Sequence, residues 1–299
     1  MSACAEIEMQ ITVRGALRDG MAQLAAANAP SHALAAELLL MHATGRDRAW
    51  IYAHPEAELD EQCAEVFFEL VARRASGVPT QYLTGKQEFW GMEFEVTPAV
   101  LIPRPETEHL IEVALQRLDE RSGAKRDESV RIADVGTGSG CIATALAKEL
   151  PNAQIVATDI SAEALQVAMR NATRLGVAQR VRLVQCDLLE SQKCESQTFD
   201  LIVSNPPYVA PAEENELARE VREHEPHTAL FAGTTGTEIY AQLIAQASER
   251  LRRGGLLVME IGYGAVKRVR TMLGAKLWAD VRVTKDLAGI ARAISAERA

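Results

Sequence analysis

The sequence predicts an α/β protein with a doubly wound, mainly parallel sheet, preceded by a small helical domain and a β-hairpin linker. From Val130 onward, short apolar runs alternate with segments of helical period, which is the pattern of βαβ crossovers in a parallel sheet. Before about residue 76, apolar residues recur only at helical spacing. Between these regions, residues 88–96 alternate around a glycine, as is typical of a hairpin.

Composition narrows the class of protein. The 299 residues are 47% hydrophobic and 24% charged, which is ordinary for a soluble globular protein with room for two domains. A net charge of −9 argues against a protein held to nucleic acid mainly by phosphate contacts. No apolar run is long enough to span a bilayer, the N-terminus lacks the pattern of a signal peptide, and the five cysteines include no CxxC pair. We therefore expect a cytoplasmic protein without membrane contact, disulfides or a bound metal.

The chain divides into three predicted parts. Residues 1–76 are expected to form a helical domain, residues 77–120 a hairpin and linker helix, and residues 121–299 the α/β domain. Gly77 and Pro79 mark the first boundary, because both residues interrupt regular structure.

The stretch Leu101–Glu108, with the sequence LIPRPETE, has two interpretations. It is either a linker stiffened by its prolines, in which Thr107 caps the following helix, or a segment that places Arg104 and Glu106 at the border of a site. The sequence alone leaves both open.

The elements of the α/β domain follow from apolar runs and from helical spacing. Strands are predicted at Arg131–Val135, Gln154–Thr158, Val181–Cys186, Asp200–Ser204, Gly255–Ile261, Val281–Lys285 and Ala291–Ser295. Helices are predicted at Cys141–Leu150, Ala162–Leu175, Gly236–Arg252 and Ala265–Leu273. In such sheets, ligands bind beyond the carboxyl ends of the strands.

A glycine-rich turn, Asp134–Gly140, lies between the first of these strands and its helix. Its glycines permit a tight turn and allow a ligand to lie against backbone N–H groups at the start of the helix. The turn is not a P-loop, because no Gly-Lys-Ser/Thr follows it, and its spacing differs from the GxGxxG dinucleotide motif. By itself it is a weak indication of a ligand.

Two acids follow the next two strands. Asp159 ends the second strand roughly 20 residues beyond the turn, the offset at which an acid meets ribose hydroxyls. Its alternative role is to cap the helix after Ser161. Asp187 follows the third strand, where a side chain can meet an adenine edge, although an ordinary turn acid is an equally good interpretation.

The fourth strand ends in Asn205-Pro206-Pro207-Tyr208. Two prolines fix φ and remove two backbone donors, so they stiffen an arm that presents one carboxamide and one aromatic ring. Such an arm can hold a planar NH₂ group by its hydrogens, although an ordinary strand-ending turn remains open. The glycine-rich turn, the two acids and the arm follow four successive strands in order. This combination indicates a ligand site more specifically than any one of the four features does.

The motifs resemble those of class I S-adenosylmethionine-dependent methyltransferases that act on planar nitrogens. More closely, from about residue 33 to residue 292, the chain resembles the peptide-chain release-factor glutamine methyltransferases. The matching stretches are Gly77-Val78-Pro79, Tyr82-Leu83, Glu88-Phe89, Leu101–Glu108, Asp134–Gly140, Asn205–Tyr208, Glu225-Pro226, Ala229-Leu230 and Asp286–Gly289.

This resemblance implies methylation of the glutamine side chain in the Gly-Gly-Gln loop of release factors, with S-adenosyl-L-methionine as cofactor and S-adenosyl-L-homocysteine as product. It implies that the helical domain grips the release factor; we expect a monomer without stably bound nucleic acid. The implied substrate contacts are Asn205, Pro206, Pro207 and Tyr208, of which Asn205, Pro206 and Tyr208 are the expected catalytic residues. The implied cofactor contacts are Gly136, Thr137, Gly138, Ser139, Gly140, Asp159, Asp187, Leu188 and Asn205.

Two positions depart from the family pattern. Leu188 stands where relatives often have an aromatic residue, and the turn Gly233–Gly236 lacks the aspartate that the family often carries. Both departures affect local contacts rather than the reacting atoms.

The arm suggests a mechanism that needs no strong base. A glutamine amide nitrogen is a poor nucleophile, because its lone pair is delocalised into the carbonyl group. We expect the Asn205 side-chain oxygen and the Pro206 carbonyl to accept the two amide N–H groups and so orient the nitrogen. Tyr208 would pack on the amide plane.

Two other functions remain open at this point. An amino-adenine methyltransferase acting on DNA or RNA would use the same arm, but the acidic charge and the LIPRPETE stretch argue against it. A cofactor-binding protein without turnover would not need an intact Asn205 and Tyr208. Residues 209–235 form a long polar connection that we expect to close over the substrate, and Pro226 separates His224 from His227, which disfavours a metal site.

Overall fold

The computed structural model describes residues 11–122, 129–191, 194 and 198–299. These residues form two compact units. The first comprises the chain up to Gly85 together with Arg219–His224, and the second comprises the remainder. The chain therefore passes between the units three times, whereas the division predicted from the sequence, at residues 76 and 120, stays a prediction.

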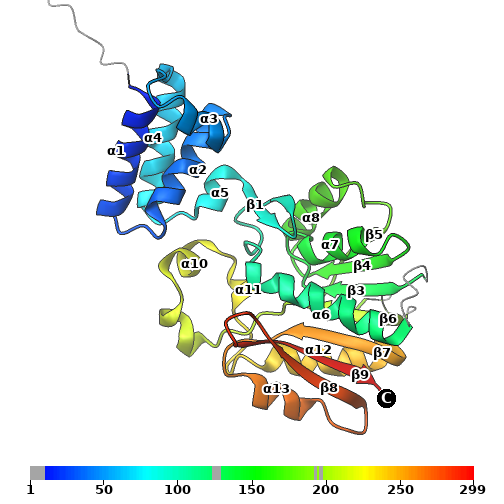
Figure 1. Ribbon diagram of the computed structural model, residues 1–299. Helices are drawn as coiled ribbons and strands as arrows, with labels where there is room; N and C mark the ends of the chain where they lie inside the picture. Colours follow the sequence, from blue (N-terminus) through cyan, green and yellow to red (C-terminus); the bar gives the residue numbers. More distant parts are fainter. Residues whose placement is uncertain (1–10, 123–128, 192–193, 195–197) are drawn as a thin grey trace, which may run out of the picture. The chain divides into compact units, whose positions relative to one another are not determined.

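The first unit is a helical bundle (Figure 1). Its helices are α1 Val13–Ala26, α2 His32–Thr44, α3 Arg48–Ala53, α4 Glu61–Ala75, α5 Thr80–Thr84 and α10 Arg219–His224. Leu24, Leu39, Leu40 and Phe67 are fully buried in its core. Apolar burial of this kind supplies most of a small domain's stability.

An ion pair joins α10 to the other helices of this unit. The side chain of Arg74 is 4% exposed, and its Nη1 lies 2.7 Å from Glu220 Oε2. Arg74 also donates to the carbonyl of Val78 at 3.1 Å. Because a buried guanidinium is costly unless it is paired, this contact explains why α10 groups with helices far from it in the sequence.

The second unit contains the sheet. Before the sheet come β1 Lys86–Phe89, β2 Met92–Glu95 and α6 Pro105–Ser122. The parallel part comprises β3 Arg131–Val135, α7 Cys141–Glu149, β4 Gln154–Asp159, α8 Ala162–Arg174, β5 Val181–Gln185 and β6 Phe199–Ser204. The remaining elements are η1 Pro211–Glu216, α11 His227–Leu230, α12 Glu238–Arg250, β7 Leu251–Glu260, α13 Val266–Met272, β8 Trp278–Lys285 and β9 Ala291–Arg298.

The seven strands have the order β5-β4-β3-β6-β7-β9-β8, and only β9 runs antiparallel to its two neighbours (Figure 1). The chain builds β3, β4 and β5 outward and then returns to place β6 on the other side of β3. This reversal is the switch point at which ligands bind in doubly wound sheets. The predicted fold class, a doubly wound and mainly parallel sheet preceded by helices and a hairpin, is confirmed.

Helices cover both faces of the sheet. The hairpin, α6, α7 and α8 share one apolar cluster with Ile132 and Leu201, and α12 and α13 share the other with Ala133 and Ile202. All six residues of β6 are buried, which explains why the sequence of this strand is a nearly continuous apolar run. The unit therefore holds the end of β6 rigidly at its centre.

Most predicted elements are correct to within two residues, but three strands are longer than predicted: β7 begins at Leu251 instead of Gly255, β8 begins at Trp278 instead of Val281, and β9 ends at Arg298 instead of Ser295. The sequence predicts a helix through Arg252, whereas α12 ends at Arg250 and β7 already begins at Leu251. Leu251 pairs with Phe199 of β6 across a register shift, so tertiary pairing extends the strand.

The described part of the chain has no helix both long and apolar enough to cross a bilayer. It also contains no group of three or more His, Cys, Asp or Glu side chains placed to hold a metal ion.

Candidate active site

A cavity of about 300 Å³ lies beyond the carboxyl ends of four neighbouring strands, β5, β4, β3 and β6. Each of these strands contributes the residue or residues that follow its end, as expected at a switch point. The lining residues are Ala99, Val100, Leu101, Gly136, Gly138, Asp159, Ile160, Ser161, Ala164, Cys186, Asp187, Leu188, Asn205, Pro207, Pro226, Thr228, Ala229, Phe231 and Ile239.

The glycine-rich turn forms one wall of the cavity. Gly136 and Gly138 have φ of 72° and 53°, and a Cβ built on either would meet no atom within 4 Å. Asp134 holds the turn from beneath, because its Oδ2 accepts from Thr137 Oγ1 at 2.6 Å and from Ala143 N at 3.0 Å. Burial raises the pKa of Asp134 to about 7. The open space over the two glycines suits a ligand that lies against the backbone.

Asp159 borders the same cavity from the end of β4. Its Oδ2 accepts from Gly138 N at 2.9 Å and its Oδ1 from Ser161 N at 2.9 Å. Ser161, and not Asp159, caps α8 through a hydrogen bond from Ala164 N at 3.0 Å, so the alternative role as a helix cap is wrong. Burial raises the pKa of Asp159. A carboxylate retains acceptor capacity beyond two hydrogen bonds, so Asp159 can also accept from ligand hydroxyls.

The structure brings most of the predicted site residues together, but not all of them. Those that line the cavity are Gly136, Gly138, Asp159, Asp187, Leu188, Asn205 and Pro207. Those that do not are Thr137, Ser139, Gly140, Pro206 and Tyr208.

The residues of the turn outside the cavity have structural contacts instead. Thr137 donates to Asp134, and the carbonyl of Ser139 accepts from Asn171 Nδ2 at 2.9 Å. A Cβ on Gly140 would lie 3.0 Å from the Cβ of Ala168, so this glycine lets α7 and α8 approach.

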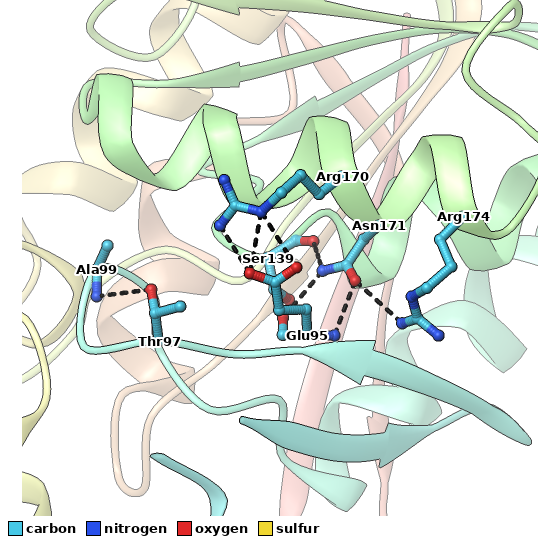
Figure 2. A network of polar contacts seen from close by, with 7 residues as sticks. All are labelled: Glu95, Thr97, Ala99, Ser139, Arg170, Asn171 and Arg174. Carbon is cyan, nitrogen blue, oxygen red and sulfur yellow. Dashed lines mark hydrogen bonds and ion pairs between the residues drawn. The ribbon is translucent and has the colours of Figure 1, made fainter. Parts of the chain in front are cut away.

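Asn171 is a residue of this region that the sequence reasoning missed. It is fully buried in α8, donates from Nδ2 to the carbonyls of Ser139 and Glu95, and accepts from Glu95 N at 2.8 Å (Figure 2). It thereby holds the end of β2 beside the glycine-rich turn, and the segment that follows β2 supplies Ala99 to the cavity. The available signal was an amide on the apolar face of an amphipathic helix.

Glu225 joins two further segments that line the cavity. Its side chain is 1% exposed, forms an ion pair with Arg104, and accepts from the backbone N–H of Ile102 at 3.2 Å. One segment supplies Leu101 and the other Pro226. Of the two interpretations of LIPRPETE, the structure supports a segment at a site, with Arg104 bracing the wall rather than lining it.

Thr107 does not cap a helix. It lies inside α6, which begins at Pro105, and its side-chain hydroxyl is 3.1 Å from Asn205 Nδ2, which donates to it. The interpretation of Thr107 as an N-cap is therefore wrong. Because Asn205 lines the cavity and its Nδ2 is bonded to Thr107, the amide oxygen is the end available to a ligand.

Tyr208, the last residue of the arm, does not line the cavity and packs against Gly262. A Cβ built on Gly262 would lie 2.7 Å from its Cδ2, so ring and backbone are in close contact. Burial raises the pKa of Tyr208 to about 12, so the phenol stays neutral at ordinary pH.

This contact leads to a prediction. Gly262→Ala is expected to displace the Tyr208 ring and to lower kcat about tenfold, because small misplacements at a site are costly, while the affinity for the cofactor stays within a few fold. Gly274→Ala is the matched control, since a Cβ there meets no atom within 4 Å and neither glycine has positive φ. Equal kcat values for the two variants in steady-state assays would contradict the assigned role of the ring.

A doubly wound sheet with a glycine-rich turn after β3, an acid ending β4 and an Asn-Pro-Pro-Tyr arm after β6 defines a class I methyltransferase. Residues 15–85 match the PrmC N-terminal domain, and residues 111–228 match the methyltransferase small domain. The release factor glutamine methyltransferase of Koribacter versatilis is 46% identical over 286 residues, which cover 95% of this chain and 98% of that protein. The enzyme of the same name from Nitratidesulfovibrio vulgaris is 45% identical over 96% of this chain and 95% of its own. The chain belongs to the release factor glutamine methyltransferase family.

Solved structures share the fold at low identity. The hMettl16 catalytic domain in complex with the MAT2A 3′UTR hairpin 1 aligns with a TM-score of 0.55 and 18% identity, over 77% of this chain and 80% of that one. The T. thermophilus 16S rRNA methyltransferase RsmC, in complex with AdoMet and guanosine, aligns with a TM-score of 0.50 and 19% identity. The alignment covers 72% of this chain and 50% of that one. These similarities concern the fold alone.

Proposed function

We propose that this protein transfers a methyl group from S-adenosyl-L-methionine to the side-chain amide nitrogen of the glutamine in the Gly-Gly-Gln loop of peptide chain release factors. The observation that carries the proposal is the placement of Asn205 on the cavity wall, with its amide nitrogen bonded to Thr107 and its oxygen available. The family membership of the chain supports the same substrate class.

The residues around the cavity fit the cofactor. The backbone of Gly136 and Gly138 leaves open space for a ligand, and Asp159 offers a carboxylate to ribose hydroxyls. Asp187 and Leu188 line the part of the wall beyond β5, where an adenine would lie. When bound, the cofactor would supply an electrophilic methyl group on a sulfonium, and Gly136, Gly138 and Asp159 would hold it.

The arm orients the nucleophile. Asn205 Oδ1 and the carbonyl of Pro206 accept the two N–H groups of the substrate amide, which aims its nitrogen lone pair at the methyl carbon and stabilises the positive charge that develops on nitrogen. Pro206 and Pro207 hold these acceptors rigidly at the end of the buried strand β6. After transfer, a proton leaves the nitrogen to water, and the electron pair of the broken carbon–sulfur bond stays on sulfur.

The remaining parts of the proposal concern partners. The helical unit, residues up to Gly85 with α10, would bind the release factor, and the parts of the segment 209–235 outside α10 would close over the glutamine. We expect a cytoplasmic monomer that forms no stable complex with nucleic acid or membranes.

Mass spectrometry of a purified release factor tests the proposal. After incubation with the protein and S-adenosyl-L-methionine, the Gly-Gly-Gln peptide is expected to gain one methyl group, located on the glutamine side chain by fragmentation. The same incubation with DNA and RNA and a labelled methyl donor is expected to leave the nucleic acid unlabelled. Label on adenine, with none on the release factor, would support the nucleic-acid alternative, and no label on either would support a binding protein without turnover.

A further inference from the structure

A buried hydrogen-bond chain runs from Asn205 into the protein. Asn205 Nδ2 donates to Thr107 Oγ1 at 3.1 Å, and Thr107 Oγ1 donates to Glu260 Oε2 at 2.7 Å. Thr107 is 2% exposed and Glu260 is 3% exposed. The three residues come from the end of β6, from α6 and from the end of β7, so this hydrogen-bond chain forms only in the folded protein.

The direction of this chain follows from the number of protons available. A hydroxyl has one proton to donate, and an ionised carboxylate can only accept. The proton of Thr107 is therefore committed to Glu260, and the oxygen of Thr107 can only accept from Asn205. Because partners decide which end of a carboxamide is oxygen, the nitrogen of Asn205 faces the protein and its oxygen faces the cavity.

We propose that Thr107 and Glu260 are positioning residues that hold the carboxamide of Asn205 with its oxygen toward the substrate. This proposal rests on the proposed function, in which that oxygen accepts a hydrogen from the glutamine amide. With the carboxamide reversed, two NH₂ groups would face each other and no hydrogen bond could form. Thr107 and Glu260 thus determine whether Asn205 can accept a hydrogen bond from the substrate amide.

The backbone around Glu260 is held as firmly as its side chain. The hydroxyl of Tyr240 donates to the carbonyl of Glu260 at 3.1 Å and accepts from the N–H of Gly262 at 3.1 Å. The backbone N–H of Thr107 donates to the carbonyl of Arg104 at 3.0 Å. Both positioning residues therefore belong to rigid parts of the unit, which is what orientation of a reacting group requires.

The same hydrogen-bond chain makes the orientation of the Asn205 carboxamide depend on pH. Burial raises the pKa of Glu260 to about 6, against the hydrogen bond from Thr107, which lowers it. The other charged or titratable groups that face Glu260 are Arg104, Glu106, Tyr208, Tyr240 and Arg292. Once protonated, Glu260 can donate to Thr107, whose own proton is then free for Asn205 Oδ1, and the carboxamide reverses. The orientation of the Asn205 carboxamide with its oxygen toward the substrate is therefore present above the pKa of Glu260, and it is lost as the pH falls through this pKa.

Steady-state kinetics of the full-length protein with a release factor and saturating S-adenosyl-L-methionine test the proposal between pH 5 and 8. Wild-type kcat is expected to fall about tenfold per pH unit below about pH 6. Thr107→Val is expected to lower kcat at pH 8 about 10- to 100-fold and to remove the fall of kcat below about pH 6, which is the acid limb of the pH profile. The KM for the cofactor is expected to stay within a few fold of the wild-type value. Thr107→Ser keeps the hydroxyl and is expected to restore both kcat and the limb.

Glu260→Gln provides the second variant, so the test stands even where Thr107→Val fails to fold. Glutamine keeps the size of the side chain but does not ionise, so the acid limb is expected to disappear and kcat at pH 8 to fall several-fold. An acid limb retained in Glu260→Gln, a wild-type kcat independent of pH between 5 and 7, or a folded Thr107→Val with wild-type kcat would each overturn the proposal. Absence of methyl on glutamine with the wild-type protein contradicts the proposed function instead.

Discussion

Asn205→Ala lowers kcat for glutamine methylation by about 10²- to 10³-fold, while the affinity for S-adenosyl-L-methionine changes only a few fold. We expect this result because removing one preorganised acceptor from a site where charge develops costs roughly that factor. The side chain lies at the edge of the cavity and is held by Thr107, so its loss removes the grip on the substrate and leaves the glycine-rich turn intact.

The measurement is single-turnover methyl transfer to a release factor, together with a binding titration of the cofactor. Asn152→Ala is the matched control, because this exposed asparagine lies in the turn before β4, away from the cavity lining. Unimpaired transfer by Asn205→Ala would refute the assignment of the carboxamide. A parallel loss of cofactor affinity would show that Asn205 acts on the cofactor instead.

Gly136→Ala weakens cofactor binding by about 100-fold or more. The Cβ of alanine would project into the open space of the cavity, where a ligand is expected to lie against the backbone. The change also strains the chain, because φ at this position is 72°, and a left-handed conformation reduces the free energy of unfolding by about 1–2 kcal/mol for a residue with a Cβ.

Gly176→Ala separates the two effects. Gly176 follows α8, has the same φ of 72°, leaves a Cβ in open space, and does not line the cavity. Both variants are expected to lose similar amounts of stability in denaturant titrations, and only Gly136→Ala is expected to lose cofactor affinity in calorimetry. Equal cofactor affinities in the two variants would contradict the proposed binding mode.

Much of the fold could be predicted because local signals and tertiary structure agree. The continuous apolar run of β6 follows from burial on both faces, and the alternation of strands and helices specifies a parallel sheet with crossovers. Since the carboxyl ends of parallel strands meet at one edge, the sequence alone predicts that the glycine-rich turn, Asp159 and Asn205 lie together.

The sequence analysis missed Asn171 and gave no partner for Glu225, because the contacts of both residues join segments far apart in the chain. Asn171 contacts Glu95 across 76 positions, and Glu225 contacts Ile102 across 123. Neither contact has a local pattern, because a hydrogen bond between distant segments depends only on where the fold brings them. The interpretation of Thr107 as a cap failed for this reason, since a threonine near a helix start has the same local signature whether it caps or not.

By itself, the amino-acid sequence determined which segments are strands and helices, which strand ends carry chemistry, and in what order they follow, because these properties depend on hydrophobic period and on the conformational limits of glycine and proline. Only the tertiary structure decided that Thr107 and Glu260 stand behind Asn205, 98 and 55 positions away in the chain. The direction of that hydrogen-bond chain depends on burial and on proton count at one point in space, and neither is encoded in any short stretch of residues.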